Sequence, residues 1–255
     1  MAIDYARSGN PALSETRFAP YRGIGVSGAE MTMQGTVNKT GILLLITMIA
    51  AGYVWRIFFG SPEPNLASVS SLMMVGAIGG FIVAMVTIFK DSWSPITAPV
   101  YAVLEGLFLG GVSAVAESQY PGIGIQAVGL TFAVCLVMLA VYSSGVIKVT
   151  DKFRIGVVAA TGGIAIFYFI SIILSMFGVR VPLINDNSWA GIGFSLVVIF
   201  IAALNLVLDF DVIQKLSRSG APKYMEWYGA FGLMVTLVWL YIEILRLLMK
   251  LKSER

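Results

Sequence analysis

The sequence has no histidine, a single cysteine and few charged residues. Its 255 residues contain 17 Lys and Arg, 14 Asp and Glu, and no His. The missing histidine excludes histidine-based catalytic triads, histidine metal sites and histidine pH switches. Because Cys135 has no second cysteine to pair with, an internal disulfide and Cys-x-x-Cys chemistry are excluded as well. Any pH-sensitive chemistry therefore falls to carboxylates.

Apolar residues are what the sequence has in excess. Hydrophobic residues make up 58% and charged residues 12% of the chain, and the mean hydropathy is +0.86. Soluble domains average roughly 45–50% apolar and about 25% charged residues. The basic residues behind the net charge of +3 flank apolar segments and form no patch. We therefore expect a polytopic membrane protein that contacts the lipid bilayer and no nucleic acid.

Long apolar segments predict an all-α fold of seven transmembrane helices. Each segment is close to the ~20 residues that cross a hydrocarbon core, and backbone groups in lipid need internal hydrogen bonds. The breaks between segments are too short for a separate soluble domain. We expect a polar tail over 1–39, a seven-helix transmembrane domain over 40–250 and a short basic tail over 251–255. The segments lie near 40–60, 66–89, 97–116, 123–147, 155–178, 189–208 and 227–248.

The distribution of basic residues predicts the orientation. With the N-terminus inside, eleven of the 17 Lys and Arg residues fall on the inner side. The positive-inside rule then favours a cytoplasmic N-terminus and an external C-terminus. The polar tail lacks the apolar core of a signal peptide, so no cleavage is expected. Small residues four apart, Gly76 with Gly80 and Gly106 with Gly110, predict close helix packing or a gating contact.

Carboxylates inside apolar segments are the candidates for function, because charges in lipid are expensive. Glu105 lies about eight residues into the third segment, ~12 Å below the inner face. It is either an ion site or a neutral acid that holds two helices. Asp209 and Asp211 close the sixth segment about 200° apart on a helix, so they face different ways. Asn205 shares the face of Asp209, whereas Asp211 is expected to meet the headgroups or Lys215.

The seventh segment carries an acidic and a basic residue on one face. Glu243 and Arg246 are three residues apart, which predicts an intrahelical ion pair, and Arg56 is a second partner at a similar level. A straight helix puts Glu243 ~24 Å from its start, near the outer face. A direct contact between Asp209 and Glu243 is therefore not expected. Thr236, seven residues before Glu243, lies on the same face and at the level of Glu105.

Four stretches of the sequence resemble the Bax inhibitor-1 family of seven-helix membrane proteins. The resemblance covers nearly the whole chain and is strongest to the bacterial branch with a longer polar tail. The stretches are Asn10–Ala12 with Met31–Thr40, Ser94–Ala98 running into Glu105–Gly110, Leu208–Phe210, and Gly220–Pro222 through Trp227 to Leu248. Their length makes the last one the most specific.

The resemblance implies six helices around a central seventh and, in characterised members, a pH-sensitive calcium leak. An aspartate at the end of the sixth helix and one in the seventh share a proton in that mechanism. The first corresponds to Asp209. A gapless match puts Thr236 at the second position, and a match anchored on Leu240–Glu243 puts Glu243 there. The depth argument favours Thr236, which leaves this chain without the acidic pair.

The leading functional prediction is an ion-conducting or ion-regulating protein of the bacterial inner membrane. Asp209 is expected to gate it, assisted by Glu105 and Asp211, and protonation at low pH is expected to close or reshape the site. Asp209 and Glu105 offer the oxygen ligands that suit Ca²⁺, which is expected as a transported ion and not as a cofactor. The alternative is a non-conducting protein that binds other membrane proteins and regulates them or their turnover. An enzyme is not expected. Asp209 and Asp211 point away from each other, and no histidine is present for a serine or metal protease.

Overall fold

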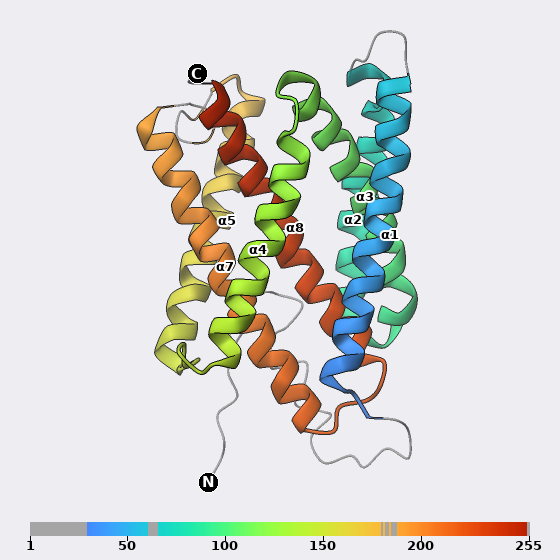
Figure 1. Cartoon of the computed structure of the whole chain (residues 1–255), viewed down its shortest axis with the longest axis vertical. Coiled ribbons are helices and arrows are strands. Elements are labelled where there is room, and N and C mark those ends of the chain that lie inside the picture. Colours follow the sequence, from blue (N-terminus) through green and yellow to red (C-terminus); the bar gives the residue numbers. More distant parts are fainter. Residues whose placement is uncertain (1–29, 61–65, 180, 182–183, 185–187, 254–255) are drawn as a thin grey trace. The chain divides into compact units, whose positions relative to one another are not determined.

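The computed structural model describes residues 30–60, 66–179, 181, 184 and 188–253 (Figure 1). Within these residues, seven helices are long and apolar enough to cross a membrane, which confirms the predicted fold class. They are α1 (Met33–Gly60), α2 (Ser70–Phe89), α3 (Ser94–Gln119), α4 (Ile123–Ser143), α5 (Asp151–Met176), α7 (Trp189–Arg218) and α8 (Met225–Ser253). Most of the expected polar tail, residues 1–29, lies outside the described residues.

Several helices extend further than the apolar segments predict. The first begins at Met33 instead of 40, and the last runs from Met225 to Ser253 instead of over 227–248. The sixth, α7, continues ten residues past the expected end at 208. Its extension is amphipathic, because Val212, Ile213 and Leu216 are buried while polar residues lie between them. Asp209 consequently lies inside a helix and does not close it.

Glycines with positive φ end two of the long helices. At the end of α7, Gly220 has φ +70° and the Ala221 N–H donates to the Leu216 carbonyl. At the end of α5, Gly178 has φ +80° and the Val179 N–H donates to the Leu174 carbonyl. This six-to-one hydrogen bond around a left-handed residue is the Schellman C-cap, which glycine adopts without steric strain.

The chain divides into two compact units, which we describe separately. Unit 1 contains residues 125–212 and 236–253, and unit 2 contains residues 30–124 and 213–235. The arrangement of six helices around a central seventh remains a prediction.

Unit 2 is built on close packing of α3 against α1 and α2. A Cβ atom at Gly106 would lie 2.5 Å from the Thr47 carbonyl oxygen, and one at Gly76 would lie 2.5 Å from that of Leu104. Only glycine fits at such distances. The small-residue pairs therefore mark helix-packing positions, as expected from their spacing.

Unit 1 is joined by polar contacts between its helices as well as by apolar packing. α7 contacts α4 through Phe210, whose ring lies 6.0 Å from that of Tyr142. It also contacts α8 near the C-terminus of the chain, where the buried Lys250 ammonium donates to the Gly191 carbonyl at 2.9 Å and to the Ser195 hydroxyl at 3.0 Å. α7 thus contacts its neighbours at widely spaced levels.

Candidate functional site

The most deeply buried acid within a membrane-length helix of unit 1 is Asp209. Its side chain is 0% exposed, and the Thr236 hydroxyl of α8 donates to its Oδ2 at 2.6 Å. Asn205, one turn earlier on α7, is also buried. Its amide donates to the Thr161 hydroxyl of α5 at 2.7 Å and to the Ile201 carbonyl at 2.9 Å.

Asp209 and Asn205 therefore form the polar stripe that their spacing predicts, and Thr236 completes it from α8. The partner on α8 was the open question in the sequence, where Thr236 and Glu243 were alternatives. The contact with Thr236 favours the gapless match. The donor there is a hydroxyl, so the buried pair contains one carboxylate instead of two.

Asp211 is held by a buried arginine that no sequence pattern singled out. The Arg154 guanidinium on α5 is 3% exposed and donates to Asp211 Oδ2 at 2.8 Å. It also contacts the exposed Asp151 carboxylate at 3.2 Å. Arg154 and Asp211 are 57 residues apart, so no local spacing pairs them. The contact places Asp211 in an ion pair between α5 and α7, away from the face of Asp209.

Glu243 and Arg246 form the ion pair that their spacing predicts. Arg246 Nη1 lies 2.9 Å from Glu243 Oε1. Tyr168 of α5 joins them, because its hydroxyl donates to Glu243 Oε1 at 2.9 Å and accepts from Arg246 at 2.7 Å. The guanidinium also lies 5.1 Å from the centre of the Tyr168 ring. The Tyr168 contribution could not be read from the sequence.

Glu105 and Arg56 belong to unit 2. Glu105 is half-buried on α3 and accepts a hydrogen bond from Tyr101, whose ring packs edge-on against Phe231 of α8. Arg56 is exposed near the end of α1. A shared site of Glu105 with Asp209, and a pairing of Arg56 with Glu243, join the two units and remain predictions. Within the described part of the chain, no three Asp, Glu or Cys side chains cluster as a metal site would require.

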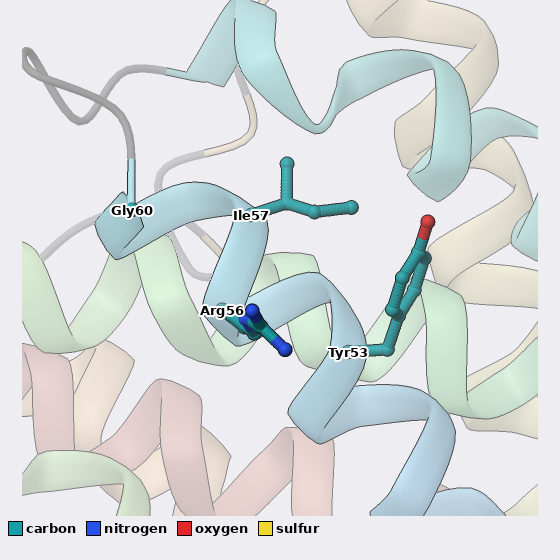
Figure 2. A pocket seen from close by; sticks show the side chains of 4 residues that line it. All are labelled: Tyr53, Arg56, Ile57 and Gly60. Carbon is teal, nitrogen blue, oxygen red and sulfur yellow. The ribbon is translucent and has the colours of Figure 1, made fainter.

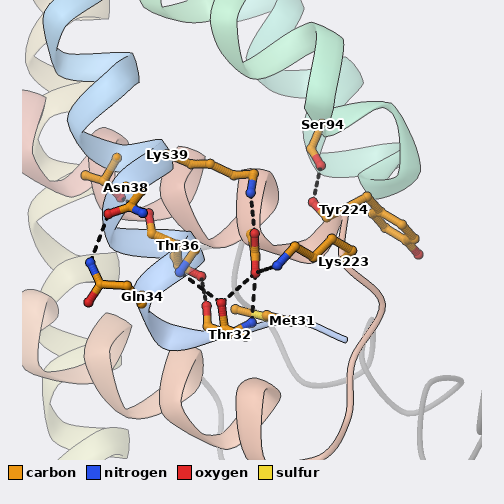
Figure 3. Close-up of polar contacts among 12 residues, drawn as sticks. Met31, Thr32, Gln34, Thr36, Asn38, Lys39, Ser94, Lys223 and Tyr224 are labelled. Carbon is orange, nitrogen blue, oxygen red and sulfur yellow. Dashed lines mark hydrogen bonds and ion pairs between the residues drawn. The ribbon is translucent and has the colours of Figure 1, made fainter. Parts of the chain in front are cut away.

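A second buried acid, Glu226, organises one end of unit 2. It lies in the first turn of α8 and is 0% exposed. It pairs with Lys39 of α1 and, at 2.7 Å, with Lys223. Figure 3 labels both lysines and Thr32 in this cluster. The backbone N–H and the hydroxyl of Thr32 each donate to it at 2.9 Å. We call these four residues the Glu226 clasp.

The clasp ties the segment before α1 to the connection between α7 and α8. The Met31 N–H donates to the Ala221 carbonyl at 2.7 Å, and Glu30 forms an isolated antiparallel bridge with Pro222. The Ser94 hydroxyl adds a hydrogen bond to the Tyr224 carbonyl at 3.1 Å (Figure 3). Sequence reasoning missed the clasp because Thr32 and Lys39 fell in the expected tail. An acidic residue in the first turn of α8 was the one available signal.

Comparison with known proteins gives a family for the chain. No curated protein and no solved structure matches it. The family model described as Bax inhibitor 1 like matches residues 10–253, nearly the whole chain. The matched region includes all seven membrane-length helices and the residues of both buried clusters. The chain therefore belongs to the Bax inhibitor 1 like family.

Proposed function

We propose that this protein conducts ions, or regulates their passage, across the bacterial inner membrane, with Ca²⁺ and H⁺ as its ions. The observation that carries the proposal is the fully buried Asp209 carboxylate, held by Thr236 inside two membrane-length helices. Ionisable groups in such segments usually mark ion or proton pathways. Membership in the Bax inhibitor 1 like family supports the same proposal, because the resemblance to the Bax inhibitor-1 family implies a pH-sensitive calcium leak.

The proposed gate depends on the charge of Asp209. When ionised, its carboxylate offers hard oxygen atoms to a passing cation. Protonation removes that charge, so the site loses its attraction for the cation and the flux falls. Thr236 positions Oδ2 through its hydrogen bond. Glu105 is proposed as a second acidic group along the path. These residues act on ions, and we propose no enzymatic reaction for them.

The test is Ca²⁺ flux into liposomes that carry the purified full-length protein, scanned from about pH 5 to 8. Asp209→Asn removes the charge but keeps the side-chain size. We expect it to reduce the flux about tenfold at neutral pH and to abolish the pH dependence. Asp151→Asn is the control, because that carboxylate is 77% exposed at the start of α5. It should leave flux and pH profile unchanged.

The same experiment separates conduction from the alternative function. A protein that only binds other membrane proteins gives no flux at any pH. If the wild type conducts but Asp209→Asn has the same flux and pH profile, conduction survives and the gate assignment is wrong.

A further inference from the structure

The last two turns of α1 border a small open hollow in unit 2. It has a volume of about 260 Å³ and is lined by Tyr53, Arg56, Ile57 and Gly60 (Figure 2). Their spacing of three, four and seven residues puts them on one face of the helix. Ile57 also packs against the hydrophobic cluster that joins α1, α2 and α3, so this wall of the hollow is fixed by the core.

Arg56 brings a positive charge to this hollow. Its side chain is exposed, and no carboxylate among the described residues of unit 2 pairs with it. Arg154 and Arg246, by contrast, each have a carboxylate partner. The guanidinium is permanently charged, and its planar fork matches the oxygen atoms of a phosphate. The Tyr53 side chain, one turn away and 58% exposed, supplies a second donor through its hydroxyl.

The position of Arg56 along α1 corresponds to the level of lipid headgroups. Seventeen residues separate Lys39 from Arg56, which is about 26 Å along a helix axis. The hydrocarbon core is ~30 Å thick, so the two basic residues lie near its opposite boundaries. Between them, apolar side chains lie exposed on the same side of the helix as Arg56: Ile42, Leu45 and Ile49.

We propose that Arg56 and Tyr53 bind the headgroup phosphate of an anionic phospholipid, whose acyl chain lies along Ile42, Leu45 and Ile49. Drug-sized ligands occupy pockets of roughly 300–1,000 Å³, so the hollow suits a headgroup whose tail stays in the bilayer. A zwitterionic lipid carries an ammonium as well. Because no described carboxylate lines the hollow, an anionic headgroup is the better match. This site is independent of the proposed ion gate.

The test is native mass spectrometry of the full-length protein in detergent, titrated with phosphatidylglycerol or with phosphatidylcholine. We expect the wild type to retain phosphatidylglycerol more tightly than phosphatidylcholine. Arg56→Gln should weaken the first phosphatidylglycerol binding step about tenfold, as expected for a lost charge-assisted contact. Arg56→Lys should give a smaller loss of affinity, because the positive charge remains and only the planar arrangement of guanidinium N–H donors is lost. Tyr53→Phe should weaken binding about threefold.

The control is Lys90→Gln, which removes an exposed cation that stacks on Trp93 at the end of α2. It should bind phosphatidylglycerol like the wild type. Equal binding by wild type and Arg56→Gln overturns the proposal, as does an equal loss in Lys90→Gln. If inorganic phosphate displaces the bound lipid more effectively than short-chain phosphatidylglycerol does, the site binds a free anion, and the proposal of a lipid ligand is overturned. If Arg56→Gln elutes as aggregate, the comparison of Tyr53→Phe with Lys90→Gln decides.

Discussion

Asp209, Arg154 and Glu226 are buried charged side chains, and each has a defined hydrogen-bonding partner. A lone charge in a low-dielectric interior is strongly destabilising. Removing one member of a buried pair therefore destabilises more than the pair itself contributes. The three residues differ in what surrounds them. Glu226 and Arg154 each pair with an opposite charge, whereas Asp209 accepts a hydrogen bond from the Thr236 hydroxyl.

The Glu226 clasp predicts that a single substitution at Glu226 lowers the stability of the protein. Glu226→Gln removes the charge that Lys39 and Lys223 share and weakens the hydrogen bonds from Thr32. Because both lysines are partly exposed and water can replace some of the lost interaction, we expect the free energy of unfolding to fall by about 2 kcal/mol. Equilibrium unfolding of the protein in mixed detergent micelles measures this free energy. Asp151→Asn should stay within about 0.5 kcal/mol of wild type, and an equal loss in both variants would contradict the clasp.

At the scale of helices, a different kind of contact joins the helices within each unit. Glycines let α3 approach α1 and α2 closely in unit 2. In unit 1 an ion pair joins α5 to α7, and a hydrogen bond from the Tyr168 hydroxyl to Glu243 joins α5 to α8. Both kinds are position-specific, so each has a matched control variant that lacks the contact.

The glycine contact predicts that Gly106→Ala separates α3 from α1. The new Cβ would lie 2.6 Å from the Ala50 Cβ and 2.5 Å from the Thr47 carbonyl oxygen. Such overpacking lowers the free energy of unfolding by about 1–3 kcal/mol. Gly52→Ala on α1 is the control, because its Cβ meets nothing within 4 Å. It should leave stability unchanged or raise it by up to about 1 kcal/mol. A stable Gly106→Ala protein would refute the close-packing role.

The ion pair between α5 and α7 predicts a larger effect. Arg154→Gln leaves the Asp211 carboxylate, whose side chain is 12% exposed, without its guanidinium. We expect a loss of about 3 kcal/mol in the free energy of unfolding. Lys152→Gln changes an exposed cation in the same turn of α5 and should have no measurable effect. The idea fails if the two variants unfold alike.

For the whole molecule, composition and segment length were sufficient to predict seven membrane helices, because hydropathy over ~20 residues is a local property. The faces of Asn205 and Asp209 and the Glu243–Arg246 pair followed from helical periodicity. Arg154, Tyr168 and the Glu226 clasp could not be predicted, since their partners lie far away in the sequence. The extension of α7 past 208 was also missed. Polar residues lie between its buried apolar residues, so the segment does not read as a continuous apolar run.

An odd number of spans predicts that the two ends of the chain lie on opposite sides of the membrane. The excess of basic residues on the side of the N-terminus predicts that this side faces the cytoplasm. A C-terminal alkaline phosphatase fusion in bacterial cells should be active, and a C-terminal green fluorescent protein fusion should be dark. The opposite pattern would reverse the assigned orientation.

The central claim is that protonation of Asp209 controls the passage of ions. The most direct measurement is infrared difference spectroscopy of the protein in liposomes, acidified from about pH 8 to 5, beside the flux assay. A protonated-carboxyl band should appear on acidification, be absent in Asp209→Asn and have the same midpoint as the loss of Ca²⁺ flux. A pH-dependent flux with no band that Asp209→Asn removes would contradict the account.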